Sequence, residues 1–175
     1  TGFTYTNLDQ DTAGYISGFE SYKVEDLARS NENPDAFRKN RAVRLWTNAK
    51  WDLADDAQLS ITPYFRNQSM DFRMHFLPGT PLEKNDQQGF GLQSQYQQPL
   101  SENWRLDMGV DYEYTEGGLQ QFQEGPTQGS AFLEATVPEG QHYDYQVDAT
   151  LVAPFASLMW EQDAWTVTIG ARYEY

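Results

Sequence analysis

Apolar and polar side chains alternate with a period of two along much of this chain, and the pattern is clearest between residues 104 and 115. One side of that stretch carries Trp104, Leu106, Met108, Val110, Tyr112 and Tyr114, and the other carries Arg105, Asp107, Gly109, Asp111 and Glu113. The last eleven residues repeat it, with Trp165, Val167, Ile169, Ala171, Tyr173 and Tyr175 opposed to Thr166, Thr168, Gly170, Arg172 and Glu174. A period of two predicts β-strands that have one apolar and one charged face.

Weaker alternation extends this prediction to about seven strands. It is present in residues 42–53, 58–66 and 88–97, with Trp46 as an exception on the polar side. Residues 146–160 are less regular, because 151–155 are apolar on both sides and Pro154 has no backbone N–H for a sheet hydrogen bond. We expect a bulge or irregular pairing near Pro154.

The predicted connections alternate between short and long. Residues 54–57, 100–103 and 161–163 are short turns, whereas residues 9–40, 71–87 and 116–145 are long and rich in Gly, Pro, Asn, Asp and Gln. A short helical turn is expected within residues 20–40. Outer-membrane β-barrels have this asymmetry, with short periplasmic turns, long extracellular loops and aromatic residues at both membrane interfaces.

The aromatic residues fit two such girdles. Beside the short turns lie Trp51, Trp104, Trp160 and Trp165, and at the opposite strand ends we expect Tyr112, Tyr114, Tyr173 and Tyr175. A soluble β-sandwich also has alternating strands, but its core does not require tryptophans to cluster at one height.

Composition narrows the possible classes. The formal net charge is −14, from 12 Lys plus Arg against 26 Asp plus Glu, which is the wrong sign for a nucleic-acid-binding groove. No stretch approaches the roughly 18 apolar residues of a membrane-spanning helix. Without cysteine the chain has no disulfide and no thiolate metal site, and residues 1–6 do not form a signal peptide.

An odd number of strands indicates a piece of a larger barrel. Single-chain bacterial barrels normally have an even number of strands, and open sheet edges are not tolerated in hydrocarbon because their N–H and C=O groups lack partners. We therefore expect residues 1–175 to be one partial β-barrel domain.

Several segments resemble the barrel of TonB-dependent receptors: residues 62–66 (TPYFR), 70–79 (MDFRMHFLPG), 140–147 (GQHYDYQV), 153–160 (APFASLMW) and 165–175 (WTVTIGARYEY). The resemblance covers most of the chain and is moderately specific for the family, but not for a ligand. It implies a 22-stranded transmembrane barrel closed by a plug domain, with energy supplied through TonB. Neither plug nor TonB-contact segment is present in these residues.

Candidate ligand-binding residues follow from this interpretation. Arg73, His75 and Phe76 fall in the second long loop, and Tyr64 and Arg66 lie below them on the lumen face, where cationic donors suit an anionic ferric chelate. The alternative, which the pattern favours, is lumen-lining charge paired with acids. His142 and Tyr143 follow the third loop and are either ligand contacts or, preferably, members of the outer girdle.

No motif of an enzyme, a metal site or a bound cofactor is recognisable. His75 and His142 lack a second ligand at a suitable spacing. The sequence thus predicts a fragment of an outer-membrane receptor that imports ferric-siderophore-like cargo, with lipid, the cargo and the TonB complex (through a plug) as partners. Two alternatives stay open: a passive channel or adhesive barrel, and a soluble β-sandwich carbohydrate-binding module.

Overall fold

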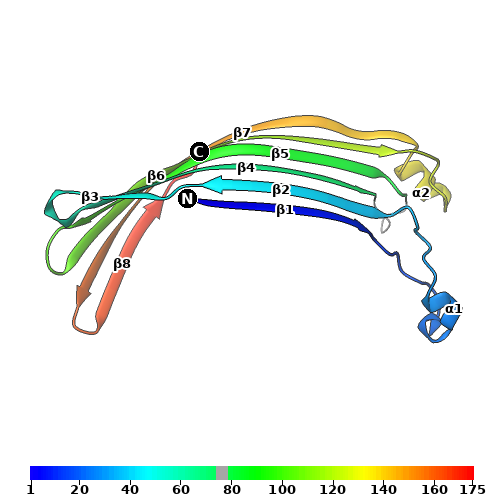
Figure 1. The fold of residues 1–175 in the computed structure, drawn as a ribbon, viewed down its shortest axis with the longest axis horizontal. Coiled ribbons are helices and arrows are strands. Elements are labelled where there is room, and N and C mark those ends of the chain that lie inside the picture. The colour runs from blue at the N-terminus through cyan, green and yellow to red at the C-terminus, as the bar shows by residue number, and fades with distance from the viewer. Residues whose placement is uncertain (74–78) are drawn as a thin grey trace.

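The computed structural model describes residues 1–73 and 79–175, and in these residues it is an all-β protein built on one antiparallel sheet (Figure 1). The strands are β1 (Gly2–Asp11), β2 (Phe37–Trp46), β3 (Ala49–Asp52), β4 (Gln58–Arg73), β5 (Leu82–Pro99), β6 (Trp104–Gln123), β7 (Gly140–Gln162) and β8 (Trp165–Arg172). Short helical segments are η1 (Ser21–Lys23), α1 (Glu25–Ala28), η2 (Ala54–Asp56) and α2 (Ala131–Thr136).

The sheet is a meander in which each strand pairs with its neighbours in sequence. The order is β1-β2-β4-β5-β6-β7-β8, and β3 also pairs with β4, below β2. Because β2 and β3 are separated only by Thr47 and Asn48 and pair with one strand, they act as one interrupted strand. The meander therefore has the seven strands that the alternation predicts.

The two ends of the sheet differ, as the sequence predicts. Short connections at residues 53–57, 100–103 and 163–164 gather at one end, which we call the turn end, and α1 and α2 lie at the other, the loop end (Figure 1). The helical turn expected within residues 20–40 is confirmed by η1 and α1. Helix α2 was not predicted; Ser130 caps it by accepting a hydrogen bond from the Leu133 N–H.

The long connections are shorter than predicted. Strand β6 continues to Gln123 and β7 begins at Gly140, so much of residues 116–145 is paired strand, and β5 already begins at Leu82. These segments have polar residues or glycine at most positions on both faces, a composition that we interpreted as loop. Hydrogen bonds in a sheet join backbone groups. A strand with water on both faces therefore forms even where apolar and polar side chains do not alternate.

Pairing is regular at Pro154, where irregularity was expected. Pro154 lies opposite Val110 of β6, and its carbonyl accepts a hydrogen bond from the Tyr173 N–H on the other side. The N–H that proline lacks would therefore point toward the end of β8, so the ladder between β6 and β7 loses nothing. The register shift of this pair lies instead at Gln121 and Phe122.

The sheet is open, and β1 and β8 are its edges. No second sheet covers either face in the described residues, so the two packed layers of a β-sandwich are not the arrangement seen here. Buried apolar residues are correspondingly few: Ala36, Ala57, Phe72 and Ala153, together with Pro81. Large apolar side chains instead lie exposed along the strands.

In the described part of the chain, no helix has the length and apolar character needed to span a membrane.

Candidate functional site

The two faces of the sheet are named here by residues that they carry. The tryptophan face carries Trp104, Val110 and Tyr114 of β6, and the arginine face carries Glu113 and Thr115 of β6 with Arg66 of β4. Directly paired residues of neighbouring strands share a face, so the register assigns every strand residue to one of the two.

The lower half of the tryptophan face is a mainly apolar band, in which Ser94, Gln98 and Thr150 are the polar exceptions among the paired residues of β5 and β7. Its rows run from Trp104 paired with Trp160, near the turn end, up to the row that joins Phe65, Phe90 and Tyr114. Many of its side chains are well exposed, among them Val110 (40%), Phe90 (52%) and Ile169 (72%). We call these rows the apolar band.

Above the apolar band the same face becomes polar at the next row in β4 to β7, and one row higher in β1 and β2, where Tyr5 and Val43 continue the row of Asn67. The next row joins Asn67, Gln88, Glu116 and Asp148, and the one above it joins Ser69, Asp86, Gly118 and Gln146. The Tyr114 hydroxyl and the Gln88 amide both donate to the Glu116 carboxylate, at 3.0 and 2.7 Å. The apolar band therefore ends at a defined height, although the strands continue.

Aromatic residues mark both limits of the apolar band. Trp51, Trp104, Trp160 and Trp165 all lie on the tryptophan face near the turn end, and the Trp104 and Trp160 rings are 6.4 Å apart. At the upper limit the Phe90 ring lies 6.1 Å from that of Tyr112 and 5.8 Å from that of Tyr114.

Of the four upper tyrosines, Tyr173 and Tyr175 lie just beyond the end of β8, as predicted, but Tyr112 and Tyr114 do not lie at a strand end. Tyr112 and Tyr114 lie in the middle of β6. Tyr175 exchanges backbone hydrogen bonds with Val152, which pairs with Tyr112, and Tyr173 binds Pro154, which pairs with Val110. Tyr175 is thus level with Tyr112, and Tyr173 lies one row lower. The prediction was wrong on strand length, because the polar continuation of β6 had been taken for loop.

The arginine face holds a network of charged and hydroxyl groups at mid-height. The Tyr64 hydroxyl donates to the Glu113 carboxylate, and so does the Arg66 guanidinium. Arg66 also donates to the Thr115 hydroxyl at 3.2 Å, and Thr115 donates to Glu113 at 2.9 Å. Tyr64 and Arg66 thus share the face that we predicted, and Arg66 has the acidic partner that our alternative for it requires.

Two glycines allow this network to form. Tyr64 and Arg66 belong to β4 and Glu113 to β6, so their side chains must lie across β5, where Gly91 pairs with Tyr64 and Gly89 with Arg66. A Cβ atom on Gly91 would lie 2.3 Å from Tyr64 Cζ, and one on Gly89 would lie 2.9 Å from the Thr115 hydroxyl oxygen. Only glycine leaves the path across β5 open.

A hollow of about 540 Å³ lies below this network on the arginine face. Asn48 donates to Thr62 at 2.7 Å and to Ser60 at 3.2 Å at its edge. Arg172 of β8 reaches Asp111 of β6 at 2.6 Å across it. The hollow has hydrogen-bonding groups and one paired cation, as a water-contacting surface does.

Arg73, which was predicted for the loop end, does not join the Tyr64–Arg66 network. Arg73 is the last residue of β4, on the tryptophan face opposite Leu82, and it pairs with Glu124 at 2.8 Å. It was predicted to lie in a loop above Arg66; in the structure it lies on the other face of the sheet, because seven positions separate the two in a strand of period two. His75 and Phe76 lie outside the described residues.

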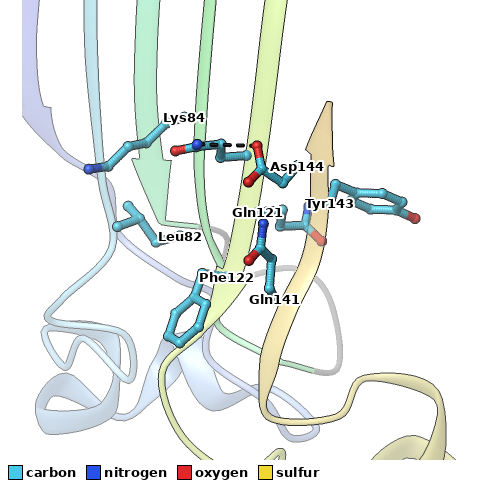
Figure 2. Close-up of a pocket in the computed structure, with 8 residues that line it drawn as sticks. Leu82, Lys84, Gln121, Phe122, Gln141, Tyr143 and Asp144 are labelled. Atoms are coloured by element: carbon cyan, nitrogen blue, oxygen red, sulfur yellow. Dashed lines mark hydrogen bonds between the residues drawn. The ribbon is translucent and has the colours of Figure 1, made fainter. Parts of the chain in front are cut away.

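His142 and Tyr143 lie beside the register shift near the start of β7. The His142 ring is 3.0 Å from the Gln121 amide oxygen and 2.7 Å from the Pro138 carbonyl oxygen. Tyr143 pairs with Gln121 on the arginine face, and its ring points away from the hollow lined by Leu82, Lys84, Phe122 and Asp144 (Figure 2). Tyr143 lies far above the apolar band and on the other face of the sheet from the aromatic rings at its upper limit.

Several residues of the network were missed by sequence reasoning. Glu113, Thr115, Gly89 and Gly91 fall inside strands whose alternation we used only to assign faces. Gly89 and Gly91 could have been recognised from the sequence, because two glycines separated by one residue leave that part of one strand face without side chains. Register alone decides what fills that space.

Among residues 1–73 and 79–175, no group of His, Asp and Glu side chains is arranged to hold a metal ion. No protein-family model matches the chain, and neither the curated proteins nor the solved structures include a significant match.

Proposed function

We propose that this chain forms part of the wall of an outer-membrane β-barrel of the TonB-dependent receptor type, which binds and imports ferric-siderophore-like cargo. The observation that supports it most is the limited height of the apolar band. Soluble proteins rarely expose a contiguous apolar surface of this extent. Contact with lipid explains why one half of this sheet face is apolar and the other half polar.

The dimensions of the apolar band suit a bilayer. A tilted transmembrane strand needs about 9–11 residues to cross the hydrocarbon, which is the stretch from Trp104 to Tyr114 in β6. Tryptophan at the lower limit and tyrosine at the upper limit correspond to the aromatic girdles of such barrels. In this proposal the polar rows above Tyr114 stand in water outside the cell, and the arginine face lines the lumen.

The open edges are consistent with a larger barrel. A lipid-embedded sheet must pair its edge groups, so β1 and β8 would continue into further strands of a closed barrel, of 22 strands in the family that the sequence resembles. A plug domain would occupy the lumen and connect the cargo to the TonB complex.

Cargo binding is supported by donor groups on the arginine face and by the loop end. Arg66 uses only Nη2 for its hydrogen bonds to Glu113 and Thr115 and keeps Nη1 for the lumen, whereas the Tyr64 and Thr115 hydroxyls already donate to Glu113. A rigid sheet with long connections at one end is a common arrangement for recognition. A passive channel would share this lumen chemistry, so uptake of a ferric chelate that stops when TonB is deleted is the measurement that separates the two.

A matched pair of arginine substitutions tests the membrane assignment. Val110→Arg places a charge in the middle of the apolar band, where lipid should impose about 2–4 kcal/mol. Gln120→Arg places the same charge on the same face of the same strand, above the band, and should cost little. Assembly of the complete barrel that contains this segment into outer membranes, or into lipid vesicles, is measured for both variants; equal yields would refute a lipid-facing band.

A further inference from the structure

The register shift between β6 and β7 places the His142 ring between two hydrogen-bond acceptors. Its Nδ1 atom is 3.0 Å from the Gln121 Oε1 atom, and its Nε2 atom is 2.7 Å from the Pro138 carbonyl oxygen. Carbonyl oxygens accept hydrogen bonds and do not donate them. A neutral imidazole has one N–H group, whereas the protonated ring has two. Both contacts are therefore hydrogen bonds only when the His142 ring is protonated.

Glu83 determines which atom of the Gln121 amide faces the ring. The Gln121 Nε2 atom donates to the Glu83 carboxylate at 2.9 Å, so Oε1 is the atom directed toward His142. Turning the amide over would offer a donor to a neutral ring, but it would also point the amide oxygen at the carboxylate. A charged carboxylate only accepts hydrogen bonds. Glu83 therefore opposes the one rearrangement that would suit a neutral His142.

The contact with Pro138 joins the connection between β6 and β7, residues 124–139, to the sheet. That connection carries α2, which ends just before Val137, and the Thr127 hydroxyl donates to the Val137 carbonyl at 2.6 Å. When the ring loses its proton, one of its two acceptors faces a lone pair instead of an N–H group. Gln121 is buried and bound to Glu83, whereas Pro138 is exposed. The contact with Pro138 is therefore the one that opens.

The charged groups on the surrounding elements do not respond in the same pH range. Within the described part of the chain they are Arg38 of β2, Glu83 of β5, Glu124 after β6, Glu134 and Glu139 of the connection, and Asp144 of β7. Glu124 pairs with Arg73, and Asp144 lies on the tryptophan face, where it accepts from Gln120. Carboxylates and arginines ordinarily keep their charge between about pH 5 and pH 8, where histidine changes its own.

From this geometry we infer that protonation of His142 orders the connection between β6 and β7. The protonated ring makes both hydrogen bonds, so the connection that carries α2 is held to the sheet in acid. The bond to Pro138 is lost as the pH rises and the ring becomes neutral. The inference goes beyond the proposed function, because it concerns how the loop end responds to pH and holds whether or not the apolar band contacts lipid.

A nitroxide spin label on α2 tests this inference in the complete protein that contains this segment. Phe132→Cys is a suitable labelling position, because Phe132 is 72% exposed and this chain has no cysteine of its own. Between about pH 5 and pH 8, the ratio of mobile to immobile label should rise about tenfold or more, the factor typical of losing one hydrogen bond to a charged group.

Three substitutions identify the cause of that rise. His142→Gln should abolish the pH response, because glutamine does not titrate. Glu83→Gln should weaken the response, because the Gln121 amide can then turn over and donate to a neutral ring. Asp144→Asn is the matched control: it removes a carboxylate from the same strand on the tryptophan face, and should leave the response unchanged.

A label whose mobility stays constant with pH in the parent protein would overturn the inference. So would a full response in either His142→Gln or Glu83→Gln, because the hydrogen-bonded chain from Glu83 through Gln121 to His142 would then not be its origin. If His142→Gln fails to fold, Glu83→Gln decides the question, since it preserves the shape of the side chain and alters only its charge and donors.

Discussion

Gly91 illustrates how a single residue on β5 controls contacts between two other strands. Tyr64 can reach Glu113 only because position 91 has no side chain. The same arrangement recurs at Gly109, where a Cβ atom would lie 2.7 Å from the Phe155 ring. Aromatic rings that cover glycines in a neighbouring strand restore some of the packing that glycine loses.

Gly91→Ala should therefore destabilise the sheet. The methyl group would displace the Tyr64 ring and separate its hydroxyl from Glu113, and overpacking of this kind costs about 1–3 kcal/mol. The measurement is the free energy of unfolding in urea from detergent or vesicles. Gly117→Ala is the control, since a Cβ atom there makes only ordinary contacts, the nearest at 3.4 Å.

A double variant separates this mechanism from a general effect of alanine in β5. If the clash with Tyr64 is the cause, Tyr64→Ala should remove most of the penalty of Gly91→Ala, and the two changes will not be additive. Additive losses would show that Gly91 acts through something other than the Tyr64 ring.

At the scale of the element, β7 shows how a strand accommodates a proline. Pro154 lies where the N–H would point toward β8 rather than toward β6. The neighbouring residue Ala153 is fully buried. Its backbone N–H points the other way, toward its partner Asp111 in β6.

Moving the proline by one residue should break the β6–β7 pairing. Ala153→Pro removes a hydrogen bond from the middle of the ladder, whereas Pro154→Ala should be tolerated because it restores a donor at the β8 edge. Hydrogen–deuterium exchange of β6 amides around Asp111 is the readout. Protection that stays the same in Ala153→Pro would contradict this account of β7.

For the whole molecule, the proposed location of the apolar band in a membrane predicts a depth in the bilayer for each aromatic residue. A tryptophan introduced at Val110 should be quenched most by lipids with bromine near the centre of the acyl chains. Trp104 and Trp160, at the lower limit, should be quenched most by bromine near the headgroups. The measurement uses the full chain in vesicles, with the remaining tryptophans replaced by phenylalanine; equal quenching profiles would mean that the apolar band does not cross the bilayer.

The candidate site was predictable only in part. Arg66 and Tyr64 were found because their face and charge follow from period two within β4. Their partner Glu113 lies 47 positions beyond Arg66 in the chain. Strand lengths were misjudged for a related reason, because the polar upper halves of β5, β6 and β7 have no apolar alternation to mark them.

The sequence by itself determined that the protein is all-β, that its strands follow one another as a meander, and that short and long connections alternate between the two ends. These properties follow from local chemistry: side-chain alternation and the composition of turns. Only the tertiary structure decided the register, the height at which the apolar band ends, and the pairing of Tyr64 and Arg66 with Glu113 across two glycines. Those depend on which residues lie opposite one another in neighbouring strands, and hydrogen bonds between backbones far apart in the chain fix that choice.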